Sequence, residues 1–141
     1  MMKGLRLYKK EKLCSETAIG ILFSRNPDNS SSLSFPLRAV WRNNPSRRSD
    51  APISFLISVP KKRLKHAVDR VAVRRRIREA YRLARPDFPL PADKRIDLAF
   101  IYVADKIRPY HNIDRAVRNI LAAIVAENSS VTVPADEETV R

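Results

Sequence analysis

The sequence ISFLISVPKKRLKHAVDRVAVRRRIREAYRLA, residues 53–84, joins a short apolar run, a lysine pair and a long arginine-rich segment. Every second residue from Ile53 to Val59 is apolar, which is the period of a strand with one buried face. Residues 64–84 contain no Gly or Pro and are rich in Arg, Ala, Leu and Glu, which favour helix. The stretch therefore predicts a strand that Pro60 terminates, followed by a long helix.

The predicted helix has an apolar side and a basic side when its residues are placed at about 100° intervals. The apolar side is expected to face the core and consists of Val73, Ile77, Ala80 and Ala84, with Tyr81 at its edge. Beside it run five arginines that we call the basic stripe: Arg70, Arg74, Arg78 and Arg82 at every fourth position, and Arg75 next to them. Like charges at this spacing repel by about 0.2–0.5 kcal/mol per pair. The stripe therefore favours binding to phosphate over a merely solvated surface.

The charge of the whole chain agrees with a polyanion as the partner. The 141 residues include 28 Lys and Arg against 15 Asp and Glu, a net charge of +13, and residues 61–85 alone hold 11 basic and 2 acidic side chains. Hydrophobic residues make up 44% of the chain, enough for a packed core. We expect a single domain over residues 1–127 and a disordered C-terminal tail over the aperiodic, acidic residues 128–141.

Upstream of the opening stretch, the pattern predicts a helix and one further strand. Residues 5–23 carry apolar side chains at three- and four-residue spacings, typical of an amphipathic helix, and the polar residues 26–34 suggest a loop. Residues 35–42 alternate in the manner of a strand. The polar residues 43–50 connect that strand to residues 53–59, so the two strands are expected to form an antiparallel hairpin.

Downstream, residues 96–103 form a nearly continuous apolar run, which is typical of a strand covered on both faces. Residues 112–127 have the apolar period of an amphipathic helix, with Asn112 as a candidate cap. The predicted order is helix, strand, strand, helix, strand, helix, with room for another short strand before Pro36. This order indicates a small α/β sandwich.

Few side chains in the sequence suit catalysis or metal binding. The one cysteine, Cys14, and two distant histidines, His66 and His111, exclude an intramolecular disulfide and a Cys/His metal cluster. Asp97 and Asp105 flank an apolar strand, but a paired-carboxylate nuclease site there is disfavoured. The start of the sequence lacks an apolar signal core, and no run reaches the roughly 18 apolar residues of a membrane span. We therefore expect a cytoplasmic protein without catalytic residues or metal ligands of its own.

The segment also resembles a known family through its combination of motifs. A strand is followed by Ser58-Val-Pro-Lys-Lys62, Ala67-Val-Asp-Arg70, Arg74-Arg75 and Ile77-Arg78-Glu79-Ala80-Tyr81-Arg82. This constellation resembles the protein component of bacterial ribonuclease P, with weaker similarity at Leu5-Arg-Leu7, Lys10-Glu11 and Phe35-Pro-Leu37. It departs from the family at Val71-Ala72, where the family has Asn-Arg, and at residues 63–66, which are one residue longer and lack Gly-Asn.

The resemblance implies a particular α+β sandwich. The family has three helices and a four-stranded sheet in the order α-β-β-β-α-β-α. Its crossover from strand through the basic helix to strand is left-handed, although such β-α-β connections are right-handed in about 98% of cases. On the strength of the resemblance, we expect the left-handed crossover in this chain.

The resemblance further implies the protein subunit of ribonuclease P, the endoribonuclease that removes the 5′ leader from precursor tRNA. The partners would be the catalytic RNA and precursor tRNA, and the RNA-borne active site would use Mg²⁺. The residues expected to bind RNA are Lys61, Lys62, Lys65, Arg70, Arg74, Arg75, Arg78 and Arg82. The family holds the leader in a cleft between its first helix and its sheet, for which the candidates are Phe35, Leu37 and Arg38.

Two other classes of basic protein compete with this interpretation. A DNA-binding regulator would need Asn, Gln or Ser side chains among the arginines of residues 64–84 to recognise bases, and none occurs there. A basic protein that binds the ribosome or ribosomal RNA without a nuclease role is the stronger competitor.

Overall fold

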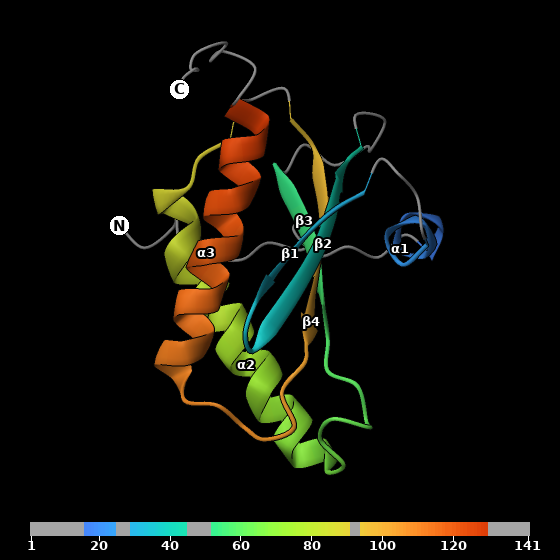
Figure 1. Ribbon diagram of the computed structural model, residues 1–141, viewed down its shortest axis with the longest axis vertical. Coiled ribbons are helices and arrows are strands. Elements are labelled where there is room, and N and C mark those ends of the chain that lie inside the picture. The colour runs from blue at the N-terminus through green and yellow to red at the C-terminus, as the bar shows by residue number, and fades with distance from the viewer. Residues whose placement is uncertain (1–15, 25–28, 45–51, 91–93, 130–141) are drawn as a thin grey trace, which may run out of the picture.

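The computed structural model describes residues 16–24, 29–44, 52–90 and 94–129. Within them the chain forms three α-helices, four strands and one short 3₁₀ turn (Figure 1). In chain order these are α1 (Glu16–Leu22), β1 (Ser30–Ser34), β2 (Leu37–Asn43), β3 (Ile53–Ser58), α2 (Ala67–Ala84), η3 (Arg85–Asp87), β4 (Ile96–Tyr102) and α3 (Tyr110–Ser129). The expected order α-β-β-β-α-β-α is therefore confirmed.

The sheet has the strand order β1-β2-β4-β3, and only its β3–β4 pair is parallel. The prediction of a hairpin between residues 35–42 and 53–59 is wrong, because β4 lies between β2 and β3. The apolar sequence of β4 explains its central place, since a strand with apolar side chains on both faces is stable only where both faces are covered. The β3–α2–β4 connection joins the parallel pair, and the left-handed sense of this crossover stays a prediction.

β1 occupies a segment for which the sequence predicted a loop. Residues Ser30–Ser34 pair with β2 along their whole length, although four of the five side chains are serine. Ser30 and Ser34 point towards α3, where Ser30 Oγ donates a hydrogen bond to Glu127 and Ser34 Oγ accepts one from Asn119. The strand is thus held by backbone pairing and polar contacts, neither of which gives an apolar alternation in the sequence.

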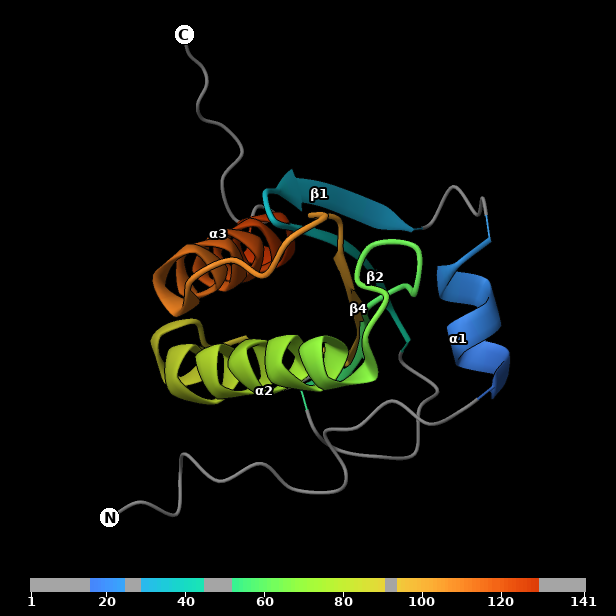
Figure 2. The ribbon, with the colours of Figure 1, turned by 90° about the horizontal axis from the view of Figure 1, so that it is seen from below.

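The helices form one layer on each side of the sheet, as Figures 1 and 2 show. α2 and α3 lie side by side on one face, which we call the α2/α3 face, and α1 covers part of the other, the α1 face. The larger core fills the α2/α3 face and includes Trp41, Phe55, Phe100, Tyr102 and Ile120. The α1 face has a smaller cluster made of Leu22, Val40 and Ala99, against which Ile19, Leu56 and Ile101 pack.

The helix and strand boundaries differ modestly from those expected. α2 begins at Ala67 rather than at residue 64, because the chain first makes a turn in which the Pro60 carbonyl accepts the N–H groups of Arg63 and Leu64. The expected β4 and the apolar side of α2 are confirmed, and Tyr81 packs 4.4 Å from Phe55 between ring centroids. α3 starts two residues before Asn112 and extends to residue 129. The remaining tail, Cys14 and the first part of the predicted N-terminal helix lie outside the described residues.

Candidate nucleic-acid interface

α2 presents its basic stripe outwards because its opposite side is fixed in the core. Val73, Ile77 and Ala80 are fully buried. On the outward side, Arg75 and Arg78 are exposed and Arg74 is half-buried. These three arginines make no ion pair or side-chain hydrogen bond with another residue of the part that the structure describes. Their guanidinium groups are therefore available to an external anion.

Arg70, the first arginine of the stripe, has a different role. Its Nη1 atom donates hydrogen bonds to the backbone carbonyls of Leu64, at 2.9 Å, and Lys65, at 2.8 Å. The side chain thereby holds the segment that connects β3 to α2 against the first turn of the helix. This structural role was not predicted, because it depends on the path of the chain before the helix.

Arg82, the last arginine of the stripe, is paired with an acidic neighbour. Its Nη2 atom lies 2.7 Å from Glu79 Oε2, and Nε donates to Oε1 at 3.1 Å. The hydrogen bond from Arg82 lowers the pKa of the Glu79 carboxyl, and the same bond raises the pKa of Arg82. Glu79 therefore stays ionised at neutral pH and competes with phosphate for this guanidinium.

The lysines precede α2 in a turn over residues 60–66, which we call the lysine turn. Lys61, Lys62 and Lys65 are all exposed in it. Arg63 anchors the turn, because its Nη1 atom lies 3.0 Å from Oδ1 of Asp105 in the loop between β4 and α3. The lysines and the start of the basic stripe therefore occupy the same end of the molecule, which Figure 2 views from below.

The structure does not bring the three candidates for the leader cleft together. Arg38 is exposed on the α1 face, two residues before Val40 in β2. Leu37 is 0% exposed and belongs to the larger core on the α2/α3 face, so its side chain is not accessible to RNA. Phe35 lies in the turn between β1 and β2, and its ring contacts Arg108. Alternation along β2 separates Leu37 from Arg38, and the turn separates Phe35 from both.

The α1 face instead carries an open row of side chains across three strands. Arg38 is paired in register with Leu33 on β1 and with Ile101 on β4, so the three side chains lie side by side. Leu33 is 70% exposed and Ile101 is half-buried, whereas the neighbouring row of Val40 and Ala99 is covered by α1. This open row, Leu33, Arg38 and Ile101, combines one cation with two apolar side chains. Sequence reasoning found only its arginine.

The described residues contain no group of three or more His, Cys, Asp or Glu side chains that could hold a metal ion. Asp97 and Asp105 do not form a pair: Asp97 is buried and accepts a hydrogen bond from Asn44 Nδ2 at 2.9 Å, whereas Asp105 is bound to Arg63. His66 is exposed, as expected. In the same part of the chain, no helix is long and apolar enough to cross a membrane.

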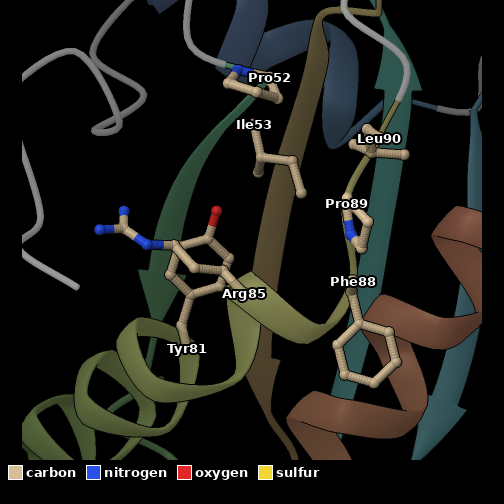
Figure 3. Close-up of a pocket in the computed structure, with 7 residues that line it drawn as sticks. All are labelled: Pro52, Ile53, Tyr81, Arg85, Phe88, Pro89 and Leu90. Atoms are coloured by element: carbon tan, nitrogen blue, oxygen red, sulfur yellow. The ribbon is translucent and has the colours of Figure 1, made fainter. Parts of the chain in front are cut away.

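A small pocket of about 120 Å³ lies between the start of β3, the end of α2 and the segment that follows η3 (Figure 3). Its lining is mainly apolar and includes Ile53, Tyr81, Phe88 and Leu90. The apolar side chains offer no hydrogen bond or charge to a phosphate, and Arg85, the cation among the lining residues, is already engaged in another interaction. We therefore do not include this pocket in the candidate interface.

An outward basic helix and a lysine turn, carried by an α+β sandwich, define a small protein that binds polyanions. The family model described as ribonuclease P matches residues 5–125. The ribonuclease P protein components of two strains of Porphyromonas gingivalis are each 33% identical to the chain over 121 residues, covering 84% of the chain and 85% of the relative. The chain belongs to the family of ribonuclease P protein components. No solved structure gave a significant match, and the ribosome-associated alternative is not favoured.

Proposed function

We propose that this chain is the subunit that binds the catalytic RNA of ribonuclease P through the lysine turn and the free arginines of α2. One observation carries the proposal: Arg74, Arg75 and Arg78 have no acidic partner among the described residues, and they project from a helix whose other side is buried. Unpaired guanidinium groups on a rigid helix are suited to bidentate contacts with phosphate. Lys61, Lys62 and Lys65 extend the same surface with three more exposed cations.

We further propose that the open row on the α1 face contacts the 5′ leader of precursor tRNA. Single-stranded RNA is commonly held by a basic groove with apolar or aromatic platforms for its bases. Arg38 supplies a cation for the backbone, and Leu33 and Ile101 supply apolar surface on either side of it. Leu37 takes no part in this contact, since it is buried on the opposite face.

In the proposed complex the protein increases the affinity for precursor tRNA, and the RNA subunit catalyses the cleavage. The active site that hydrolyses the precursor is RNA-borne and uses Mg²⁺. The described part of the chain has no carboxylate cluster that fits such an ion, so no catalytic step is assigned to its residues. The protein brings cations that reduce repulsion between two RNAs, and it acts where precursor tRNA is made, in the cytoplasm.

The test of the phosphate surface is a salt titration of binding to the catalytic RNA. With about five phosphate contacts, a fourfold rise in salt should weaken binding by roughly 10²–10³-fold. The double variant Arg74→Ala/Arg78→Ala should bind more weakly and lower the logarithmic salt slope by up to about 2. Its circular dichroism should be unchanged, because both side chains lie off the apolar side and Ala favours helix.

The control is Arg115→Ala, which removes one charge from the exposed side of α3 and is compared with the single variants Arg74→Ala and Arg78→Ala. It should change affinity and slope much less than either arginine of α2. A flat salt titration, or an equal loss for Arg115→Ala, would contradict the proposed surface.

A separate assay tests the division of labour. RNA-free protein should not cleave precursor tRNA, whereas added protein should tighten the binding of precursor to the catalytic RNA, chiefly for substrates with a leader of several nucleotides. Arg38→Ala should reduce this leader-dependent gain while leaving the binding of catalytic RNA unchanged. Metal-dependent cleavage by the protein alone would overturn the assignment.

A further inference from the structure

Phe35 occupies an unusual position for an aromatic side chain. It lies in the turn between β1 and β2, 55% of its surface is exposed, and it belongs to neither core cluster. The guanidinium carbon of Arg108 lies 5.0 Å from the centre of its ring. A single exposed apolar residue needs no functional explanation, but the contacts that fix this pair in place set it apart.

The backbone of Arg108 is fixed from two sides. Its N–H donates to the hydroxyl of Tyr102 at 3.0 Å, and its carbonyl accepts a hydrogen bond from Nη1 of Arg76 at 2.7 Å. The Tyr102 hydroxyl in turn donates to the carbonyl of Lys106 at 2.5 Å. Tyr102 is itself fully buried. The loop that carries Arg108 is therefore anchored both to the core and to α2.

The turn that carries Phe35 is attached to the same loop. The N–H of Val103 donates to the carbonyl of Pro36 at 2.9 Å, and Pro36 is buried. Ring and guanidinium are therefore held together by backbone contacts as well as by their mutual attraction. A rigid aromatic surface loses little conformational freedom when a planar ligand stacks on it.

The Phe35–Arg108 pair is also connected to the lysine turn. Arg63 binds Asp105, three residues before Arg108, and so joins the lysine turn to the loop between β4 and α3. The exposed Lys106 adds a cation between them. Arg63 neutralises the carboxylate of Asp105. The cations of Lys106 and Arg108 therefore give the loop a net positive charge that attracts an anionic ligand. In Figure 2 this loop, the lysine turn and the start of α2 share the end of the molecule that faces the viewer.

We propose that Phe35 and Arg108 form a stacking site for one unpaired base of the bound RNA. Both an aromatic ring and a guanidinium plane are surfaces on which unpaired bases stack, and neither requires a particular base. Lys106, exposed two residues before Arg108, supplies a cation for the phosphate backbone in the same loop. The inference rests on the proposed function, but it uses a surface separate from the open row on the α1 face.

The experiment compares four substitutions of one residue in binding to the catalytic RNA and to precursor tRNA with and without its leader. Phe35→Ala and Phe35→Leu should weaken the binding of one of these RNAs by about 5- to 100-fold, the usual effect of losing one stacked base. Phe35→Tyr and Phe35→Trp should bind as the natural protein does. Leucine keeps the apolar bulk of phenylalanine but has no aromatic plane. Weaker RNA binding by Phe35→Leu would therefore indicate that the base stacks on the ring, and not merely that apolar surface is buried.

The affected RNA identifies where the base comes from: the leader if the loss requires a leader, the catalytic RNA if it occurs with that RNA alone. A photoreactive p-benzoylphenylalanine at position 35 should crosslink to one or a few adjacent unpaired nucleotides of the same RNA. Thermal unfolding should be nearly unchanged in Phe35→Leu, which excludes loss of the fold.

The site is refuted if Phe35→Ala and Phe35→Leu bind as the natural protein does, or if Phe35→Trp loses as much affinity as Phe35→Ala. Such a result leaves the proposed function intact whenever Arg74→Ala/Arg78→Ala still weakens binding in the same assay. Failure of the natural protein to bind the catalytic RNA would instead refute the proposed function itself.

Discussion

Glu79 and Arg82 form a two-point ion pair on the outward side of α2, with N–O distances of 2.7 and 3.1 Å. This pair places a negative charge inside a surface that otherwise suits phosphate. The pKa of the Glu79 carboxyl is lowered by its hydrogen bond with Arg82, so the charge is present wherever RNA binding is measured near neutral pH. The last arginine of the basic stripe is therefore less available to RNA than Arg74, Arg75 and Arg78.

Replacing Glu79 with Gln should tighten binding to the catalytic RNA. The change removes the competing carboxylate and releases Arg82, so one more phosphate contact can form and the logarithmic salt slope should steepen by up to about 1. The control for net charge is Asp114→Asn, which removes one carboxylate from α3, outside the stripe, while Arg118 keeps its ion pair with Asp87. Equal effects of the two substitutions would show that only net charge matters and not the position of Arg82.

Arg70 should be more important for stability than for direct contact with RNA. Its guanidinium donates to two carbonyls before α2, and hydrogen bonds from a charged donor contribute about 1.5–3 kcal/mol when well buried. These bonds are partly exposed, so Arg70→Ala should lower the free energy of unfolding by about 1–2 kcal/mol, measured by urea denaturation. Arg74→Ala should change it by less than about 0.5 kcal/mol. Equal stability of the two variants would contradict the structural role.

Tyr102 should make the loop between β4 and α3 sensitive to alkaline pH. Burial raises the pKa of its phenol above the usual value of 10.0. Because the pKa is higher in the folded protein, the stability that this group contributes is complete below pH 10 and is lost as the pH rises through the folded value. Tyr102→Phe should cost about 0.5–1.5 kcal/mol at pH 8, since Lys106 and Arg108 lose their shared partner.

The measurement is urea unfolding at pH 8 and near pH 11 for the natural protein and Tyr102→Phe. The variant should lose less stability between these values than the natural protein does. Tyr110→Phe is the necessary companion, because burial raises the pKa of Tyr110 as well. An unchanged alkaline loss in both variants would show that neither phenol controls it.

The apolar pattern of the sequence predicted the elements that contribute most to the core. α2 and β4 follow directly from their apolar patterns, and the continuous apolarity of β4 also explains its central place. The pairing of strands was predicted less well, because adjacency in the chain suggested a hairpin that β4 interrupts. β1 was expected only as an optional short strand before Pro36 and from the family order, because its serines carry no apolar pattern and the strand is held by backbone pairing with β2.

For the candidate interface, the sequence predicted the cations but not which of them are free. The partners of Arg70 are backbone carbonyls, which no residue pattern reveals. The partner of Arg82 was visible in principle, because Glu79 lies three residues before it on the same helix surface. Leu37 and Arg38 are adjacent in sequence, yet alternation places them on opposite faces of the sheet.

The departure from the family at Val71-Ala72 leaves an apolar side chain within the basic stripe. Val71 is 43% exposed on the outward side of α2, three and four residues before Arg74 and Arg75. An apolar side chain there provides neither a hydrogen bond nor a charge to RNA. Val71→Asn with Ala72→Arg should therefore tighten binding to the catalytic RNA by about 1 kcal/mol and steepen the logarithmic salt slope by up to about 1.

The core should not change, because Val73 and Ile77 supply it from the opposite side of the helix. Ala122→Arg is the control for charge alone, since it adds an arginine to the exposed side of α3. Unchanged affinity in the double variant would mean either that RNA contacts another surface or that Lys65 and His66 already fill this role. Repeating the titration with those two residues replaced by alanine separates the cases, because only compensation would then let the double variant restore binding.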